Sequence, residues 1–374
     1  MGAVKKERIC GLDVIRTASM LFVVAVHVLG IGGGIANTQN MLLKVLFCLL
    51  QAVSLCCINL FAMSSGFLHY GRKPHLSGLL GLLFQSFFWL VIVTVIYAAV
   101  KGDMTVIKDN FENCLHIVTK RVYWYLSDYF VLFFLMPFLN AAVRRLEPKY
   151  LTLSIILLLF ITSFIPSVFP YIDLVSKGYS VTWLAVMYIL GAYIKKYDLI
   201  HRANTKVCFL IFEIFILLEA VYSFLSYMMG NALGDFYYKF SAYNCVFVVG
   251  ASIMLFLLLA KVDFKSEKIK NALSVMSASA FTVYLVHCAP LIYDNYIEGK
   301  MTFVRDFGAL KTLGAILGII ISIYAAGMIL GVVQNKLFKL IRIPNFFRLV
   351  ENKINICYDS LYERYIGKIT DNNA

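Results

Sequence analysis

The stretch that decides the fold reads Arg8-Ile-Cys-Gly-Leu-Asp-Val-Ile-Arg-Thr-Ala-Ser-Met-Leu-Phe-Val-Val-Ala-Val-His-Val-Leu29. From Leu12 to Ile31 it is long enough to cross a bilayer as a helix, which takes about 20 residues. Arg16 and His27 stand three helical turns apart, so they share a face, roughly 20° apart in azimuth and about 16 Å apart along the axis. Ionisable groups within a bilayer are costly and usually face a protein interior or a wet cavity. The pair therefore predicts a functional site inside a membrane domain.

The composition of the whole chain agrees with a membrane domain. Of 374 residues, 61% are hydrophobic and 15% are charged, whereas soluble domains are about half apolar and a quarter charged. We therefore expect an all-α, polytopic bundle of transmembrane helices. Apolar windows of about 20 residues predict ten spans near 12–32, 42–66, 78–100, 121–141, 150–169, 181–195, 207–228, 240–260, 277–295 and 312–334. Residues 1–334 would form the membrane domain, and residues 335–374 a basic, amphipathic cytoplasmic tail.

The basic residues favour one orientation of these spans. If the N-terminus is cytoplasmic, the inner segments and the tail hold 23 Lys and Arg residues and the outer segments hold nine. Cytoplasmic segments are enriched in Lys and Arg, so both termini are predicted to be cytoplasmic. The net charge of +13 is then mainly a consequence of topology, with binding of anionic lipid as a secondary role. No nucleic-acid partner is needed to explain it.

The nine cysteines predict neither a disulfide framework nor a metal site. Most fall inside apolar runs, where a thiol behaves as a small hydrophobic group. No cysteine has the zinc-site spacing to a histidine. We therefore predict no bound metal.

The inner mouth of the first two spans is predicted to bind a polyanion. The second span ends in Ser64-Ser-Gly66, whose small side chains allow close helix approach, and Arg72 and Lys73 follow on the inner side. Together with Arg16 they would suit phosphate groups. Alternatively, Arg72 and Lys73 only flank the membrane, and Arg16 reaches toward the lipid headgroups.

Two histidines are candidates for chemistry inside the membrane. A nearly neutral imidazole is a natural general base for a hydroxyl or a carrier of an acyl group, so His27 is the predicted catalytic centre. Tyr284 and His287 are three residues apart and share a helix face. Each histidine could instead make only a packing hydrogen bond. Trp124 and Tyr125 begin the fourth span and suit either an interfacial aromatic belt or a binding site; Asp128 is a less usual residue there.

At these residues the chain resembles the acyltransferase-3 family of membrane O-acyltransferases, which modify cell-envelope polysaccharides, lipopolysaccharides and antibiotics. The elements that carry the resemblance are Gly11-Leu-Asp-Val-Ile-Arg16, the spacing from Arg16 to His27, Phe61 to Phe67 with its Ser-Gly-Phe ending, Trp124-Tyr-Leu126 and Tyr284-Leu-Val-His287. They extend over most of the ten spans. The family's arginine-rich segment after the second span is reduced here to Arg72-Lys73 followed by Pro74. We expect a standalone member of the family, without an appended esterase-like domain.

The resemblance implies transfer of an acyl group, usually acetyl from cytoplasmic acetyl-CoA as the donor substrate, to a hydroxyl of a cell-envelope sugar or polysaccharide. It implies a multi-pass protein of the cell membrane without a permanently bound cofactor. Arg16 would hold phosphates of acyl-CoA, and His27 would deprotonate the acceptor or carry the acyl group. Binding of the donor or acceptor would fall to Asp13, Ser65, Arg72, Lys73, Trp124, Tyr125, Asp128, Tyr284 and His287.

Other functions are compatible with a bundle of this kind. A transporter or flippase of an envelope lipid or glycan would show inverted repeats and paired broken helices, which the sequence does not. Acylation could also occur on the cytoplasmic side before glycan export, although the outer position of His27 argues against it. A scaffold without chemistry would leave Arg16 and His27 unexplained. The sequence does not predict the oligomeric state.

Overall fold

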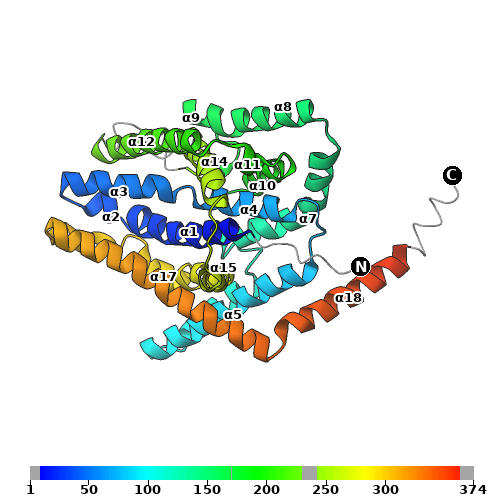
Figure 1. Cartoon of the computed structure of the whole chain (residues 1–374). Coiled ribbons are helices and arrows are strands. Elements are labelled where there is room, and N and C mark those ends of the chain that lie inside the picture. Colours follow the sequence, from blue (N-terminus) through cyan, green and yellow to red (C-terminus); the bar gives the residue numbers. More distant parts are fainter. Residues whose placement is uncertain (1–8, 170, 230–241, 363–374) are drawn as a thin grey trace.

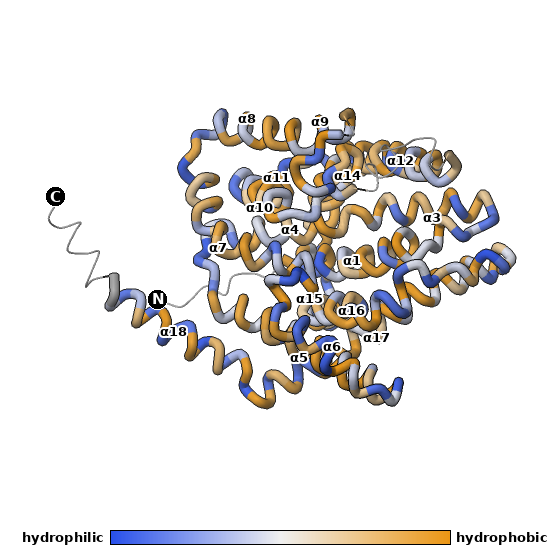
Figure 2. The backbone as a smooth tube through the Cα atoms, turned by 180° about the vertical axis from the view of Figure 1, so that it is seen from behind, coloured by the Kyte–Doolittle hydropathy of each residue, from blue (hydrophilic) through white to orange (hydrophobic). Residues whose placement is uncertain are grey.

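The computed structural model describes residues 9–169, 171–229 and 242–362, and every regular element in these ranges is a helix. The long helices run alongside one another across the bundle (Figure 1). Apolar residues occupy most of their length, and hydrophilic residues gather at helix ends and along α18 (Figure 2). The chain is therefore an all-α polytopic membrane bundle, as predicted.

Eight apolar helical stretches are long enough to cross a membrane in the described ranges. They are Cys10–Val26 (α1) with a π-helical turn to Ile31, Met41–Ser54 (α3) with Cys57–His69 (α4), Leu76–Lys101 (α5), Trp124–Arg145 (α7), Pro148–Leu159 (α8) continuing through Ile165–Val168 (α9), Thr205–Met229 (α12), Glu267–His287 (α15) and Ala309–Leu340 (α17). Shorter connecting helices are Gly34–Asn37 (α2), Thr105–Leu115 (α6), Leu199–Arg202 (α11) and Pro290–Ile292 (α16).

Two further apolar helices complete the bundle and correspond to the sixth and eighth predicted spans. Val181–Lys196 (α10) has 16 residues and Val246–Ala260 (α14) has 15. At 1.5 Å per residue each is about 24 Å long or less, shorter than the ~30 Å hydrocarbon core of a bilayer. Both pack against other helices, α10 on α4 and α7, and α14 on α12, α1 and α4.

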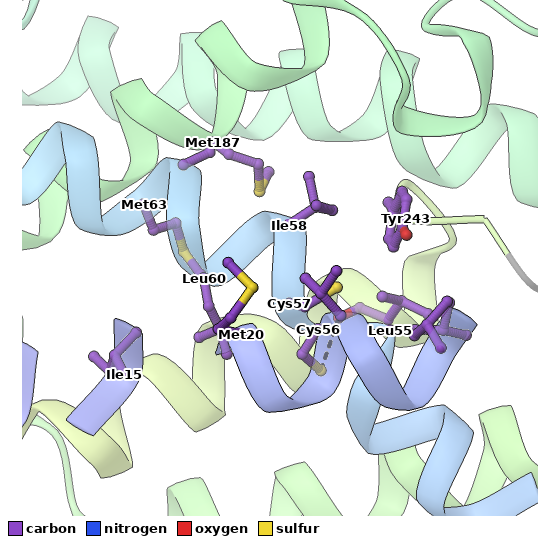
Figure 3. Packing of buried hydrophobic residues seen from close by; sticks show 14 of the residues in the cluster. Ile15, Met20, Leu55, Cys56, Cys57, Ile58, Leu60, Met63, Met187 and Tyr243 are labelled. Atoms are coloured by element: carbon purple, nitrogen blue, oxygen red, sulfur yellow. Dashed lines mark hydrogen bonds between the residues drawn. The ribbon is translucent and has the colours of Figure 1, made fainter. Parts of the chain in front are cut away.

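The packing of α4 on α10 depends on two glycines. A Cβ atom on Gly66 would lie 1.9 Å from the carbonyl oxygen of Tyr188, and one on Gly191 would lie 2.0 Å from that of Met63. The backbones of the two helices therefore touch, which confirms the close approach predicted for the small residues at the end of the second span. On its other side α4 meets α1, where Met20 lies beside Leu60 (Figure 3).

A buried amide ties three helices together beside this crossing. Asn59 of α4 is fully buried. Its Nδ2 donates to the carbonyl oxygen of Tyr243 at 2.9 Å and to Oγ of Ser252 in α14 at 3.1 Å, while Nε1 of Trp183 in α10 donates to its Oδ1 at 2.9 Å. Every hydrogen-bonding atom of the amide is thus used within the protein.

The ninth span differs from its predicted limits of 277–295. Helix α15 begins at Glu267 and ends at His287, and Pro290 opens the short helix α16. Proline lacks an N–H donor and is tolerated in a first helical turn, so Pro290 starts a new element and does not lie within the span. The break leaves His287 at the last turn of α15, directly before Cys288.

The last helix, α18 (Ile343–Tyr362), leaves the bundle at the end where α1 begins (Figure 1). The predicted tail 335–374 therefore contains the last turns of α17, which reach Leu340, and then α18. Oε1 of Glu351 accepts a hydrogen bond from the backbone N–H of Leu76 at 2.9 Å, at the first turn of α5. Helix α18 is held against the bundle by this contact and by the rings of Phe84 and Phe347, 5.7 Å apart.

Candidate active site

A cavity of about 260 Å³ opens between α1, α4, α5, α7 and α15. Apolar and aromatic side chains form most of its wall, among them Phe61, Leu82 and Phe281. Six of the predicted site residues line it: Arg16, His27, Ser65, Trp124, Tyr125 and Tyr284.

Arg16 and His27 face the same cavity, as their spacing predicts. Helix α1 is regular from Cys10 to Val26, and the two residues between them on this face, Met20 and Val23, also line the cavity. At His27 the helix widens into a π-helical turn, in which the carbonyl oxygen of His27 accepts from the N–H of Gly32 at 2.6 Å. Such turns are frequent at functional sites.

The guanidinium of Arg16 is half-buried, and it makes no hydrogen bond or ion pair with any residue that the structure describes. Tyr125, Tyr129 and His69 lie within its electrostatic reach. A charge inside a bilayer is costly unless a partner or water offsets it. Arg16 therefore offers up to five N–H donors to an anion that enters the cavity.

A chain of hydrogen bonds fixes the protons of the two buried histidines. Nδ1 of His287 lies at hydrogen-bond distance from the carbonyl oxygen of Val283, which can only accept, so this nitrogen carries a proton. In neutral His287 the other nitrogen, Nε2, is then an acceptor. It lies 3.0 Å from Nδ1 of His27, which therefore donates.

The free atom at the end of this chain is Nε2 of His27. With its proton on Nδ1, neutral His27 carries a lone pair on Nε2, and no described residue forms a hydrogen bond with that atom. His27 is buried and lines the cavity. The rings of His27 and Tyr293 are nearly perpendicular, with centroids 5.3 Å apart. The imidazole is thus held in one tautomer with its basic nitrogen available.

Aromatic rings form the wall opposite α1. Trp124 packs on Tyr179, with centroids 4.6 Å apart, and stacks on Tyr243 at 6.4 Å. Tyr125 contacts Phe61 at 6.2 Å and stacks on Tyr129 at 6.4 Å. Trp124 and Tyr125 therefore line the cavity, and their role in binding stays a prediction.

The other predicted site residues lie outside the lining of this cavity. Asp13 is buried near the start of α1, and His287 lies behind His27, where it borders a second cavity of about 620 Å³ between α15 and α17. Arg72 and Lys73 are exposed in the turn after α4. The carboxylate of Asp128 is paired with Arg121, with Oδ2 and Nη2 2.9 Å apart, so it holds the start of α7 and does not face the cavity.

The sequence did not point to two residues that lie at or beside this cavity. Gln85 lines the cavity, and its Nε2 donates to Thr282 at 2.9 Å and to Gln334. A lone amide inside an apolar run was the available signal. Cys288 was missed because its neighbours come from distant positions: its Sγ lies 3.4 Å from Nε2 of His287 and 3.6 Å from Nδ1 of His27. Unlike the cysteines inside the membrane-spanning helices, which are buried, Cys288 is partly exposed.

Comparison with known families agrees with this arrangement. The acyltransferase-3 family, described as an acyltransferase domain, matches residues 10–332. The chain belongs to the acyltransferase-3 family. Together with the apolar helices, this membership makes it a multi-pass membrane acyltransferase. No curated protein and no solved structure gave a match.

Proposed function

We propose that this acyltransferase moves an acyl group from acyl-CoA to a hydroxyl of a cell-envelope sugar or polysaccharide, and that the acyl group is acetyl. The observation that carries the proposal is the pair of free groups in one cavity. Arg16 has no partner among the described residues, and Nε2 of His27 has none either. A donor with phosphates at one end and a reactive thioester at the other fits such a pair.

The separation of the two groups supports acyl-CoA as the donor. On a regular helix Arg16 and His27 stand about 16 Å apart along the axis, a distance comparable to the pantetheine arm of CoA. Arg16 would hold a phosphate by charge-assisted hydrogen bonds. The thioester would then lie beside His27, between the aromatic rings of the cavity wall.

The chemical step follows from the position of the base. Nε2 of His27 takes the proton of the acceptor hydroxyl as its oxygen attacks the thioester carbonyl carbon. The carbon–sulfur bond breaks, the acyl group is now an ester of the acceptor, and the proton on His27 passes to the CoA thiolate. In the second possible order, His27 itself takes the acyl group from CoA and passes it to the acceptor. Both orders release one free CoA thiol per ester formed.

The wider setting is part of the same proposal. Both termini would be cytoplasmic, so that Arg16 faces the cytoplasmic supply of acyl-CoA and His27 lies in the outer half of the plasma or inner membrane. The basic residues support this orientation, because 23 of them fall on the inner side against nine on the outer side. The acceptor would be a glycan or a glycolipid.

The test uses the full-length protein in lipid nanodiscs with acetyl-CoA and an envelope glycan extract. We expect release of free thiol and acetyl ester formation in the glycan fraction, both absent with His27→Gln. A transporter or flippase would release no thiol. Equal thiol release by the wild type and His27→Gln would overturn the proposed chemistry.

A further inference from the structure

Three potential ligand atoms for a metal converge behind the cavity. They are Nδ1 of His27, Nε2 of His287 and Sγ of Cys288, and all lie within 4.8 Å of one another. The nitrogens are 3.0 Å apart, and the sulfur is 3.4 Å from one and 3.6 Å from the other. His27 and His287 are 260 residues apart in the sequence. The end of α15 after His287 places the thiol of Cys288 beside both imidazoles.

These separations match a zinc coordination polyhedron. With Zn–N bonds of about 2.0–2.1 Å and a Zn–S bond of about 2.3 Å, tetrahedral geometry places two nitrogens ~3.4 Å apart and nitrogen and sulfur ~3.6 Å apart. The two nitrogen–sulfur distances in the protein already have these values to within 0.2 Å. Only the nitrogen–nitrogen distance must lengthen, by ~0.4 Å.

The surroundings of the cluster also suit a metal. Nδ1 of His287 points at the carbonyl oxygen of Val283, and zinc-bound histidines usually give their second N–H to such an acceptor. Two imidazoles and a thiol favour Zn²⁺ and similar soft cations over Mg²⁺ or Ca²⁺, which prefer oxygen. Cys288 is partly exposed at the end of α15, so an ion can reach the thiol.

We infer that His27, His287 and Cys288 form a three-ligand site for Zn²⁺ with one open coordination position. Binding displaces the thiol proton and the proton on Nδ1 of His27. Because a neutral imidazole bound through Nδ1 must carry its proton on Nε2, the metal removes the lone pair that faces the cavity. Zn²⁺ bound here is therefore an inhibitor of acyl transfer, and this consequence rests on the proposed function, whereas binding itself does not.

The binding test uses purified, chelator-treated full-length protein in nanodiscs, titrated with Zn²⁺ by calorimetry and with Co²⁺ by absorption spectroscopy. We expect one equivalent of metal and a thiolate-to-Co²⁺ charge-transfer band. Cys288→Ser and Cys288→Ala should both abolish the band and weaken Zn²⁺ binding by at least about 100-fold. Loss of a residue that only orients a metal ligand typically weakens binding by about 10–100-fold, so a larger effect indicates a direct ligand. Cys357→Ser, which changes an exposed thiol of α18, is the matched control and should bind as the wild type. Absence of binding, or a band that survives in Cys288→Ser, would overturn the site.

The activity test separates this inference from the proposed function. Zn²⁺ should inhibit acetyl transfer by the wild type and by Cys357→Ser and should spare Cys288→Ser, where the rate of each protein with Zn²⁺ is divided by the rate of the same protein without metal. Metal binding through Cys288 with undiminished transfer would overturn the inhibitory role. Metal binding by a protein that shows no acyl transfer would overturn the proposed function and leave the site in place.

Discussion

The amide of Asn59 and the ring of His27 are both buried polar groups inside the bundle, but they differ in how many of their hydrogen-bonding atoms have a partner. Asn59 uses both hydrogens and its oxygen in bonds to neighbouring helices. His27 uses one nitrogen and leaves the other facing a cavity, and Arg16 on the same helix leaves its whole guanidinium without a described partner. An unpaired buried polar group costs free energy. We therefore interpret the fully bonded Asn59 as a structural contact, and the incompletely bonded His27 and Arg16 as groups that act on a substrate.

The comparison is sharpest at His27. A general base or acyl carrier contributes about 10²–10⁴-fold to the rate, roughly 3–5 kcal/mol of barrier. His27→Ala and His27→Gln should therefore abolish acyl transfer and leave the thermal melting of the solubilised protein and CoA binding close to the wild type. Gln retains a hydrogen-bonding side chain but cannot accept and return a proton near neutral pH. Normal acylation by His27→Gln would make this histidine a packing residue like Asn59.

Arg16 should affect donor binding more than folding. Arg16→Ala removes charge-assisted hydrogen bonds worth about 1.5–3 kcal/mol, so KM for acetyl-CoA should rise by roughly 10–100-fold. Arg16→Lys should keep part of the affinity, because it retains the charge without the planar fork. Initial rates at limiting acetyl-CoA measure the effect. A wild-type KM for the alanine variant would show that the phosphates bind elsewhere.

Asn59 should show the opposite pattern. Asn59→Ala leaves the indole N–H of Trp183 and the carbonyl of Tyr243 without their partner, at a cost of about 1–3 kcal/mol in the free energy of unfolding. We expect a lower melting temperature in detergent and an unchanged KM for acetyl-CoA in the protein that remains folded. If Asn59→Ala melts like the wild type but loses binding of acetyl-CoA, Asn59 belongs to the binding site and is not a purely structural residue.

His287 should have an intermediate effect that depends on the substitute. In His287→Gln the amide can accept from Nδ1 of His27 and donate to the carbonyl of Val283, so the tautomer of His27 is kept and kcat should fall by about tenfold or less, the equivalent of one hydrogen bond. His287→Leu removes both contacts and should lower kcat, measured per folded protein, further than His287→Gln does. Equal rates for the two variants would contradict a positioning role for His287.

The smallest effect is expected outside the membrane, at Glu351. Its pKa is lowered from the ordinary value of 4.5, chiefly by the hydrogen bond from Ser77 and also by the backbone N–H of Leu76. A lowered pKa means that the contact stabilises the protein above the pKa of the unfolded state and is lost as pH falls through the folded-state pKa. Glu351→Gln should therefore lower stability by about 0.3–1 kcal/mol at pH 7 and less near pH 4. Melting curves at the two pH values test this, and Glu267→Gln, which changes a carboxylate in the first turn of α15, is the control.

The sequence was sufficient for features that depend on neighbouring positions. Apolar runs predict the spans because crossing a bilayer needs a continuous apolar helix, and the spacing of Arg16 and His27 predicts one face because α1 is regular between them. The pairing of Asp128 with Arg121 could not be predicted, because whether the carboxylate turns toward the cavity or the arginine is decided by packing. The same holds for the bond between His27 and His287, which are 260 residues apart.

The acceptor that fixes the two histidine tautomers is the main-chain carbonyl of Val283, not a side chain. Every amino acid that supports the helix supplies the same carbonyl, so position 283 can change among apolar residues without moving the proton on His27. Many enzymes orient a catalytic histidine with a carboxylate, which a single substitution can remove. In this acyltransferase the orienting carbonyl cannot be removed by a substitution at position 283. Selection for the tautomer therefore acts on His27 and His287, whereas position 283 is restricted only by the packing of its buried side chain.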